Sequence, residues 1–484
     1  MADSSKEIAC TPVPTETQWL ESIDKIAEKK VVRKCDIHVI PILSFLMCLS
    51  FLDRINIGNA RLQGLEKDLA MSGNDFNIAL FIFFVPYILF EVPCNIILKK
   101  MAPSTWLSVV MVGWGLLTVF QGLTTSFAGL VVCRFFIGLF EAGFFPGCIY
   151  LISMYYKRHE LQTRVNFFIA CATMAGSFSG LLAYFIAGMD GARGYRSWRW
   201  IFILEGAATV VAAAFSKWMI PDWPETAKFL TEGERKVLVH RLEMEIKSAK
   251  MDRLDKPAMK RAFFDVKIYL GTIMYIGIVS SAYAISFFTP TIINQLGWEA
   301  LDAQLMAIPV FGAGACVSMA VAFISDWLRH RFTFVLCASI FASVGYIILL
   351  CQQSVSLGVS YFAVFAISVG TFTAHPITIT WLSNNMGGHY KRGISSAMQI
   401  GIGNIGGIIA SNLFFRSEAP LYPSGYGGCL ALVCVCGITC VVFFFYLRRE
   451  NRIRDKGLRD NLLQLPENEV DNLGDDHPSF RFSY

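Results

Sequence analysis

The chain has 484 residues, of which 54% are hydrophobic and only 16% are charged. Soluble globular domains carry roughly 25% charged residues, so this composition excludes an ordinary soluble enzyme. The net charge of +5 gives no reason to expect a nucleic-acid partner. A membrane span needs about 20 mainly apolar residues, so a dozen spans would occupy about half of the chain.

Apolar stretches of spanning length follow one another along the chain and predict an all-α integral membrane protein with twelve transmembrane helices in two six-helix bundles. Those in the first half are 36–59, 76–98, 106–123, 127–150, 165–189 and 200–220. Those in the second half are 266–288, 303–324, 332–351, 359–382, 394–415 and 426–447.

These stretches also predict the domains. They are an N-terminal tail (1–35), a first bundle (36–220), a polar and basic central loop (221–264), a second bundle (265–447) and a C-terminal tail (448–484). About 32 of the 42 Lys and Arg residues fall in the tails, the central loop and the loops on the same side. Positive charge concentrates on the cytoplasmic side, so both termini are expected in the cytoplasm. No signal peptide is visible.

Most of the 14 cysteines lie inside the expected spans. The largest group is Cys429, Cys434, Cys436 and Cys440, along the last span. Zinc sites need a closed set of ligands at characteristic spacing, which this group lacks, so small apolar packing residues are the better interpretation. We expect no metal site and no bound cofactor.

Charged residues inside the expected spans are the main functional signal, because a charge at bilayer depth costs at least about 2.5 to 3.5 kcal/mol. Asp53 and Arg54 lie near the outer end of the first span, and Arg134 and Glu141 share the fourth. Arg134 and Glu141 are about two helical turns apart and project from one face, about 10.5 Å apart along the axis. That separation is too long for a direct ion pair.

These four residues predict an anion site that is coupled to protons. Arg54 and Arg134 can bind a carboxylate bidentately and stay charged at any working pH. Asp53 and Glu141 can act as proton carriers, because an arriving anion changes the charge around a nearby acid. An alternative is that Asp53 pairs with Arg134 to hold two helices together, while Arg54 extends to the membrane surface.

The remaining ionisable residues inside the expected spans give weaker evidence of a functional role. Glu91 and Glu205 are expected to be structural partners or gate elements. His375 precedes Pro376 in the tenth span, where a broken helix would free backbone groups near the membrane midplane. A histidine that lines a cavity and a histidine that packs are equally good interpretations of His375.

The six-plus-six arrangement with a basic central loop resembles the major facilitator superfamily. The stretch SDWLRHR at 325–331 resembles the loop that this superfamily uses as a cytoplasmic gate lock, which assigns gate or structural roles to Asp326, Arg329 and Arg331. The corresponding stretch at 94–100 lacks the usual Gly and Asp.

A narrower resemblance is to the anion:cation symporter family, in its fungal allantoate and nicotinate permease branch. The matching segments are 33–41, LDRINIGNA at 52–60, 90–95, 134–147, WRWIFILEG at 198–206 and PDWPETAKFL at 221–230. The resemblance implies proton-coupled uptake of a small organic anion by alternating access. It implies that Arg54 and Arg134 bind substrate and that Asp53 and Glu141 take up protons, and it adds Tyr87 and Asn404 as cavity residues.

The sequence therefore predicts an organic-anion/proton symporter, with the proton as coupling ion and the lipid bilayer as its surroundings. We expect a monomer in the plasma membrane, with an internal membrane as the alternative. Nicotinate, allantoate and pantothenate all remain open as substrates. The rivals are a proton-linked exporter of an organic acid or secondary metabolite and a nutrient receptor that does not transport; an enzyme is the least favoured class. The stretch 174–182 lacks the Gly-Pro element usual in such exporters.

Overall fold

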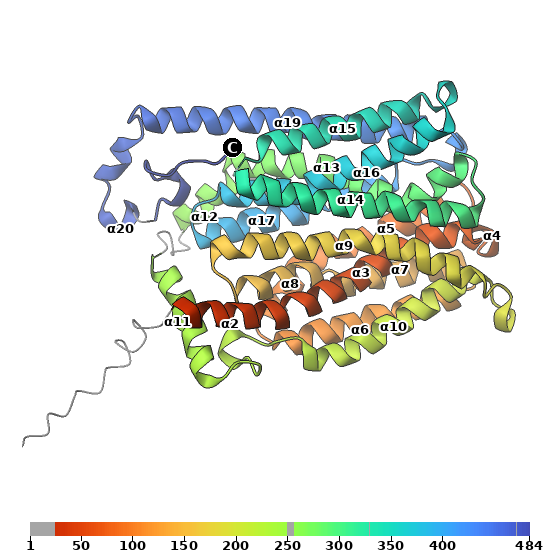
Figure 1. The fold of residues 1–484 in the computed structure, drawn as a ribbon, viewed down its shortest axis with the longest axis horizontal. Coiled ribbons are helices and arrows are strands. Elements are labelled where there is room, and N and C mark those ends of the chain that lie inside the picture. Colours follow the sequence, from red (N-terminus) through yellow and green to blue (C-terminus); the bar gives the residue numbers. More distant parts are fainter. Residues whose placement is uncertain (1–24, 249–255, 329, 471) are drawn as a thin grey trace, which may run out of the picture.

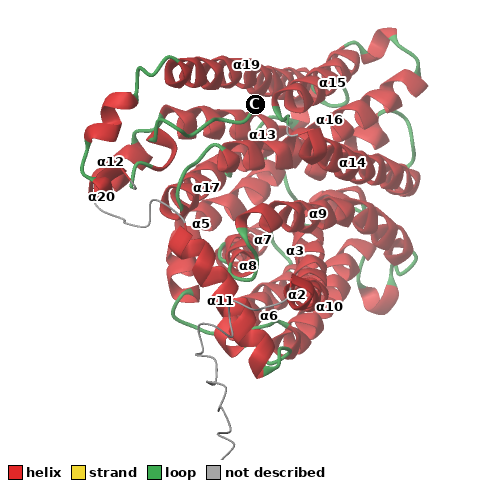
Figure 2. Cartoon of the chain, turned by 60° about the vertical axis from the view of Figure 1, so that its left-hand side comes forward, coloured by secondary structure: helices red, strands yellow, loops and turns green. Residues whose placement is uncertain are grey.

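The computed structural model describes residues 25–248, 256–328, 330–470 and 472–484. Within these ranges the chain forms α-helices and short 3-10 helices and no strand. Twelve of the helices or helix pairs are long and apolar enough to cross a membrane, which confirms the predicted number of spans. They run side by side as one bundle, with the first half of the chain on one side and the second half on the other (Figures 1 and 2).

The first half supplies six spans. Its helices are α2 (Lys25–His38), α3 (Ile40–Leu62), α5 (Asp75–Leu98), α6 (Pro103–Leu123), α7 (Phe127–Glu141), α8 (Phe144–Ser153), α9 (Arg158–Ala187) and α10 (Ser197–Met219). Helices α7 and α8 together make the fourth span. Short helices α4 (Leu65–Asp68) and η1 (Ala192–Gly194) lie in its loops.

The second half repeats this plan. Its helices are α13 (Val266–Gln295), α14 (Ala300–Leu328), α15 (Phe332–Leu350), α16 (Leu357–Asn384), α17 (His389–Gly403), α18 (Ile405–Ser411) and α19 (Pro423–Asp455). Helices α17 and α18 form the eleventh span around Asn404. The segment between the halves contains η2 (Pro224–Thr226), α11 (Glu232–Ser248) and α12 (Lys256–Phe263); the loops and the C-terminal part contain η3 (Gln352–Ser354), η4 (Arg416–Glu418), η5 (Asp460–Gln464), α20 (Glu467–Val470) and η6 (Gly474–Asp476).

The bundle has two different ends. We call the end with α2, α11, α12 and the C-terminal residues the linker end, and the end with α4 the far end (Figure 1). The halves touch mainly through α9 on α14, α3 on α13 and α5 on α18. Gly58 permits the approach of α3 to α13, because a Cβ there would lie 2.4 Å from the carbonyl oxygen of Phe287.

Residues 472–484 form a C-terminal strap against the linker end of the second half. Asp475 is fully buried, and its carboxylate contacts Lys267 Nζ at 2.5 Å and Lys391 Nζ at 2.9 Å. Arg454 donates to the carbonyl oxygen of Asp475 at 2.9 Å. The strap thus joins α13, α17 and α19, where the sequence predicts only a tail.

The last residues of the strap continue this packing. Asn451 Nδ2 donates to the Phe482 carbonyl oxygen at 3.0 Å, and the Phe482 amide donates back to Asn451 Oδ1 at 2.9 Å. Asn385 exchanges a similar pair of hydrogen bonds with Ser483. Because buried backbone groups need partners, these side chains fix the strap in one register.

Candidate functional site

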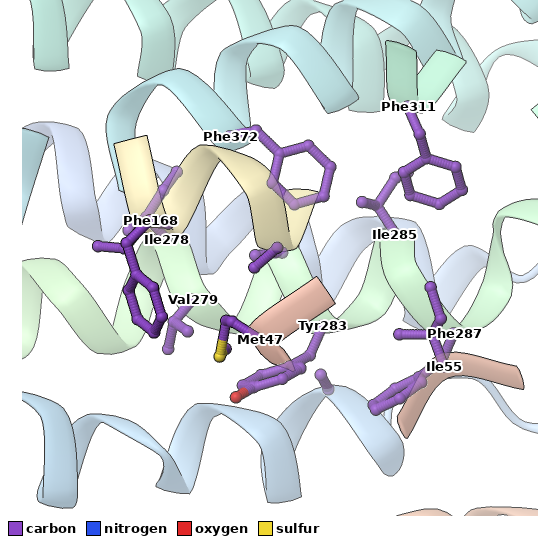
Figure 3. Packing of buried hydrophobic residues seen from close by; sticks show 14 of the residues in the cluster. Met47, Ile55, Phe168, Ile278, Val279, Tyr283, Ile285, Phe287, Phe311 and Phe372 are labelled. Carbon is purple, nitrogen blue, oxygen red and sulfur yellow. The ribbon is translucent and has the colours of Figure 1, made fainter. Parts of the chain in front are cut away.

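A cavity of about 50 Å³ lies between the halves, around the middle of α3 and α13. Most of its lining is aromatic or aliphatic, with a few polar groups, as is usual for small-molecule sites. The lining comprises Met47, Phe51, Arg54, Tyr87, Phe145, Ile169, Ala172 and Thr173 from the first half, and Tyr275, Val279, Ala282, Tyr283, Phe372, His375, Ile400 and Asn404 from the second. Figure 3 shows the sulfur of Met47 beside Val279 and the ring of Tyr283.

Arg54 is the cation of this cavity. It lies on α3 with only 4% of its surface exposed, and its guanidinium carbon is 5.0 Å from the ring centroids of both Phe83 and Tyr87. Aromatic faces attract a guanidinium, and this helps to hold the group in an apolar setting. The alternative in which Arg54 extends to the membrane surface is therefore wrong.

Glu141 of α7 is the counter-charge of Arg54. Arg54 Nη2 lies 2.7 Å from Glu141 Oε1, and both side chains are almost fully buried. Ser50, one turn before Arg54 on α3, donates its hydroxyl to the same carboxylate oxygen. Gly138 brings α7 close to α5, because a Cβ there would lie 2.1 Å from the carbonyl oxygen of Phe83.

Residues of the second half contact the other terminal nitrogen of the Arg54 guanidinium. Arg54 Nη1 donates to the hydroxyl of Tyr283 at 2.9 Å, and that hydroxyl donates to Asn404 Oδ1 at 3.1 Å. Asn404 lies at the break between α17 and α18. A chain of polar contacts thus runs from Glu141 in one half to Asn404 in the other.

Asp53 and Arg134 lie close to this chain but do not line the cavity. Asp53 Oδ2 accepts hydrogen bonds from Thr209 of α10 at 2.8 Å and from Trp114 of α6 at 3.2 Å. Consecutive residues on a helix point about 100° apart, so Asp53 and Arg54 face different neighbours. Arg134 is buried behind Arg54 and donates to its carbonyl oxygen at 3.3 Å. The predicted joint site of Arg54 and Arg134 is therefore not assembled in this conformation.

His375 and Tyr87 line the cavity; for His375 the sequence left a cavity position and a packing position equally open. His375 Nε2 lies 3.1 Å from the Tyr275 hydroxyl, and the two rings stack with centroids 5.3 Å apart. Tyr87 packs against Phe83 and the Arg54 guanidinium. These residues supply an aromatic wall with polar atoms at its edge.

The predicted gate and structural residues lie outside the cavity. Glu91 on α5 faces the second half, since a Cβ on Gly401 of α17 would lie 3.6 Å from Glu91 Oε2. Glu205 is buried in α10. Asp326, in the last turn of α14, forms an ion pair with Arg331, which precedes α15, and the Arg331 amide donates to the Tyr484 carbonyl oxygen at 2.6 Å. Arg329 lies outside the described residues.

The far end of the cavity is closed by contacts between the halves. Arg416 of the second half lies 3.6 Å from Glu66 and donates to the carbonyl oxygen of Met71. Glu66 also pairs with Arg61 at 2.7 Å. Asn77 donates to the Phe414 carbonyl oxygen at 3.1 Å.

The linker end is more open. A groove of about 440 Å³ lies between α3 and α9 of the first half and α14 and α16 of the second. Asp36, Arg164 and Asp326 bring charge to its lining, and Arg164 pairs with Asp36 at 2.6 Å. Pro376 lines the groove while its neighbour His375 lines the cavity, so the two spaces approach each other at α16.

Sequence reasoning missed Ser50, Tyr275, Tyr283, Thr209 and Trp114 as partners of the site. Hydroxyl and indole side chains are common in apolar helices, so their spacing alone gives no signal. Tyr283 could have been suspected only once a cation was placed opposite it, because a buried Tyr hydroxyl needs a partner.

Comparison with known proteins identifies the family. The profile of the Major Facilitator Superfamily matches residues 43–411. The uncharacterized transporter C1002.16c of Schizosaccharomyces pombe is 33% identical over 480 residues, covering 97% of this chain and 95% of that protein. The MFS-type transporter cnsO of Penicillium expansum is 34% identical over 478 residues, covering 94% and 90% respectively.

Solved structures agree on the fold. A bacterial homologue of the human lysosomal transporter Spinster, in an inward-facing and occupied conformation, superposes with a TM-score of 0.63. It is 15% identical and covers 85% of this chain and 96% of its own, so the likeness concerns the fold alone. The chain belongs to the major facilitator superfamily and is a multi-pass membrane transporter of that superfamily.

Proposed function

We propose that the protein is a proton-coupled symporter of a small organic anion, of the carboxylate or vitamin-like class, in the anion:cation symporter branch. The observation that carries this proposal is the buried pair of Arg54 and Glu141 beside an aromatic cavity. A guanidinium that is always charged suits a carboxylate ligand, and its present partner is a group that can be neutralised by one proton.

The pair suggests how substrate and proton are coupled. While Glu141 is ionised, it occupies the guanidinium, so an incoming carboxylate has to compete with it. When Glu141 takes up a proton, Arg54 keeps a buried charge without a counter-ion, which is costly until an anion arrives. The cavity has to widen to admit such an anion, and parting of the halves would provide that space.

The free energy stored in a proton gradient and in the membrane potential can drive such symport. A tenfold proton gradient supplies about 1.4 kcal/mol for each proton. Each net charge that crosses the membrane adds about 2.3 kcal/mol for every 100 mV. One proton carried with a monovalent anion is electroneutral, whereas a second proton would make transport electrogenic.

Arg134 and Asp53 have supporting roles in this proposal. Arg134 positions Arg54 through its carbonyl oxygen, and it supplies positive charge near Asp53. Asp53 remains a candidate proton carrier on the side of α3 that faces α6 and α10. Tyr87, His375 and Asn404 are proposed to shape the cavity around the substrate.

We propose that the linker end faces the cytoplasm, because Lys and Arg are concentrated in the loops and tails of that end. Glu91, Asp326 and Arg331 would then act at the cytoplasmic side of the transport pathway. The cavity is built within one chain, which supports a monomer as the transporting unit. The proposed location is the plasma membrane.

The proposal can be tested with the purified full chain in proteoliposomes. A thermal-shift screen with nicotinate, allantoate and pantothenate at two pH values would select a probe, whose uptake is then measured with an acidic exterior. Symport predicts accumulation that a protonophore abolishes. Inhibition of uptake by the acidic exterior would instead support a proton-linked exporter, and binding without flux would support a receptor.

A further inference from the structure

Glu205 is a buried acid that the proposed substrate site does not use. Only 5% of its surface is exposed, and it lies on α10, away from the cavity lining. Among the residues that the structure describes, neither of its carboxylate oxygens has a hydrogen-bond partner. A buried carboxylate without donors is strongly disfavoured as an anion, so the uncharged acid is the stable form at this position.

The position of Thr209 places Glu205 beside Asp53. Thr209 is four residues after Glu205, so both side chains lie on one face of α10, about one turn apart. The Thr209 hydroxyl donates to Asp53 Oδ2 at 2.8 Å. The two carboxyl groups are close enough for the charge of Asp53 to act on Glu205.

Asp53 has the donors that Glu205 lacks. Trp114 Nε1 and the Thr209 hydroxyl both donate to its Oδ2. Its Oδ1 has no partner within the described part of the chain. The charged groups that act on Asp53 from α7 are Arg134 and Glu141, a cation and an acid whose effects on Asp53 oppose each other. Hydrogen bonds therefore favour Asp53 as the anion.

Helix α6 packs against α10 next to Glu205 and carries a buried uncharged polar side chain, that of Gln121. A Cβ on Gly206 would lie 2.7 Å from the amide nitrogen of Val119, which fixes the contact between α10 and α6 next to Glu205. Gln121, one turn further along α6 from Thr118, is 1% exposed. Neither polar atom of its amide has a partner among the described residues.

We propose that Glu205 and Asp53 form a second proton-binding site, between α3, α6 and α10, in which Glu205 holds the proton and Asp53 is ionised. The proton can pass from the Glu205 hydroxyl to a carboxylate oxygen of Asp53, which exchanges the charges of the two groups without any other reactant. Two adjacent buried carboxylates do not both ionise readily, so the pair keeps at least one proton. This assignment gives Glu205 a proton-carrying role in place of a structural one.

The site deepens the proposed function, and its role in coupling rests on that function. It lies within the first half, on a different face of α3 from the one that lines the cavity. A proton there would therefore be bound in addition to the one proposed for Glu141. Loading of both sites would make the transport of a monovalent anion electrogenic.

Infrared difference spectroscopy on the purified full chain tests the site without any substrate. At neutral pH, the spectrum of wild type minus Glu205→Gln is expected to contain one carbonyl-stretch band of a protonated carboxylic acid. The spectrum of wild type minus Asp53→Asn is expected to contain a carboxylate band and no such acid band. Glu225→Gln, at an exposed position of the central segment, is the matched control and should leave the carboxylic-acid region unchanged.

Two spectroscopic outcomes would overturn the assignment. A carboxylic-acid band that is lost in Asp53→Asn would place the proton on Asp53. A Glu205→Gln protein with an unchanged acid region would mean that Glu205 is ionised. If Glu205→Gln does not fold, the Asp53→Asn spectrum alone still decides, because the loss of an acid band there contradicts the proposal. These results stand even if the chain carries no organic anion.

Transport measurements then test coupling, with the probe selected by the thermal-shift screen. Glu205→Gln is expected to keep counterflow at equal pH and to lose the share of accumulation that its own proton drives, a factor of up to about ten in a tenfold gradient, while the share driven by the Glu141 proton remains. Glu205→Asp should restore part of this accumulation because it restores an acid. Accumulation by Glu205→Gln equal to that of wild type would overturn the coupling role.

Discussion

Glu141 Oε1 and the Tyr283 hydroxyl lie on two sides of the Arg54 guanidinium, at 2.7 and 2.9 Å from its two terminal nitrogens. One contact is made within the first half and the other reaches the second half. Any movement that parts the halves near the cavity therefore breaks the contact with Tyr283 first and leaves the ion pair intact. Arg54 thus links the charge state of Glu141 to the separation of the halves.

We predict that Arg54→Lys transports poorly although it keeps the charge. An ammonium group cannot present two terminal nitrogens to Glu141 and Tyr283 at once, because it lacks the planar fork of a guanidinium. Loss of one charge-assisted hydrogen bond costs about 1.5 to 3 kcal/mol, so initial uptake should fall roughly 10- to 100-fold. Initial rates in proteoliposomes measure this.

Arg193→Lys is the control for that substitution, because Arg193 is exposed in η1 at the far end. Its uptake should equal that of wild type. If Arg54→Lys also matched wild type, the fork geometry would have no role in binding.

We predict that Glu141→Gln loses accumulation against a gradient but keeps counterflow of the substrate. Glutamine has the shape of the protonated acid, so Arg54 would remain available to the anion while no proton is carried at position 141. Ser50→Ala should be much milder, since it removes one hydrogen bond worth about 1 kcal/mol and leaves the acid in place. Concentrative uptake by Glu141→Gln at the level of wild type would contradict the assignment of Glu141 as a proton carrier.

We predict that Gly58→Ala prevents tight closure of the far end. The new Cβ would lie 2.4 Å from the Phe287 carbonyl oxygen, so α3 and α13 have to separate. A cysteine introduced by Thr291→Cys, at a buried position on α13, should then react faster with a membrane-impermeant maleimide. Gly427→Ala, where no atom lies within 4 Å of the new Cβ, is the control. Equal labelling in both backgrounds would mean that closure does not depend on this contact.

We predict that Asp475→Asn destabilises the second half. The substitution leaves Lys267 and Lys391 buried with Asp265 as their remaining carboxylate. Breaking a buried ion pair by removing one partner typically costs about 3 to 5 kcal/mol. Asp455→Asn removes an exposed pair with Arg481, which is worth about 0 to 1 kcal/mol. The midpoint of thermal unfolding should fall clearly for the first variant and hardly for the second.

This contribution of Asp475 should depend on pH. Burial alone would raise the pKa of Asp475, but the ammonium groups of Lys267 and Lys391 outweigh burial and hold that pKa below its usual range. A lowered pKa in the folded state stabilises the protein fully above the unfolded pKa of about 3.9, and this stabilisation is lost as the pH falls through the folded value. The difference between wild type and Asp475→Asn should be constant near neutral pH and shrink in acid.

Most of the fold follows from composition, because twelve spanning stretches are visible as long apolar runs. The details that the sequence did not reveal are those set by tertiary contacts. The fourth span breaks between α7 and α8, and the eleventh breaks at Asn404, although both read as continuous apolar stretches. The C-terminal strap was expected to be a tail, because its contacts are made by scattered side chains such as Asp475 and Asn451 with no periodic pattern.

The candidate site was only partly visible in the sequence. Charged side chains are rare inside membrane spans, so a search for them in the sequence finds Asp53, Arg54, Arg134 and Glu141. It does not reveal how these residues pair, because pairing depends on the rotation of each helix about its axis. Arg54 pairs with Glu141 rather than sharing a ligand with Arg134, and Asp53 turns toward α6 and α10.

The C-terminal strap also makes residues 472–484 sensitive to change. Loss of residues 472–484 would leave the buried ammonium groups of Lys267 and Lys391 with a single carboxylate, that of Asp265. Cells degrade membrane proteins with such defects, so a nonsense or frameshift change that removes residues 472–484 would lower protein abundance. Its phenotype would resemble loss of the transporter, although every residue of the cavity would still be encoded.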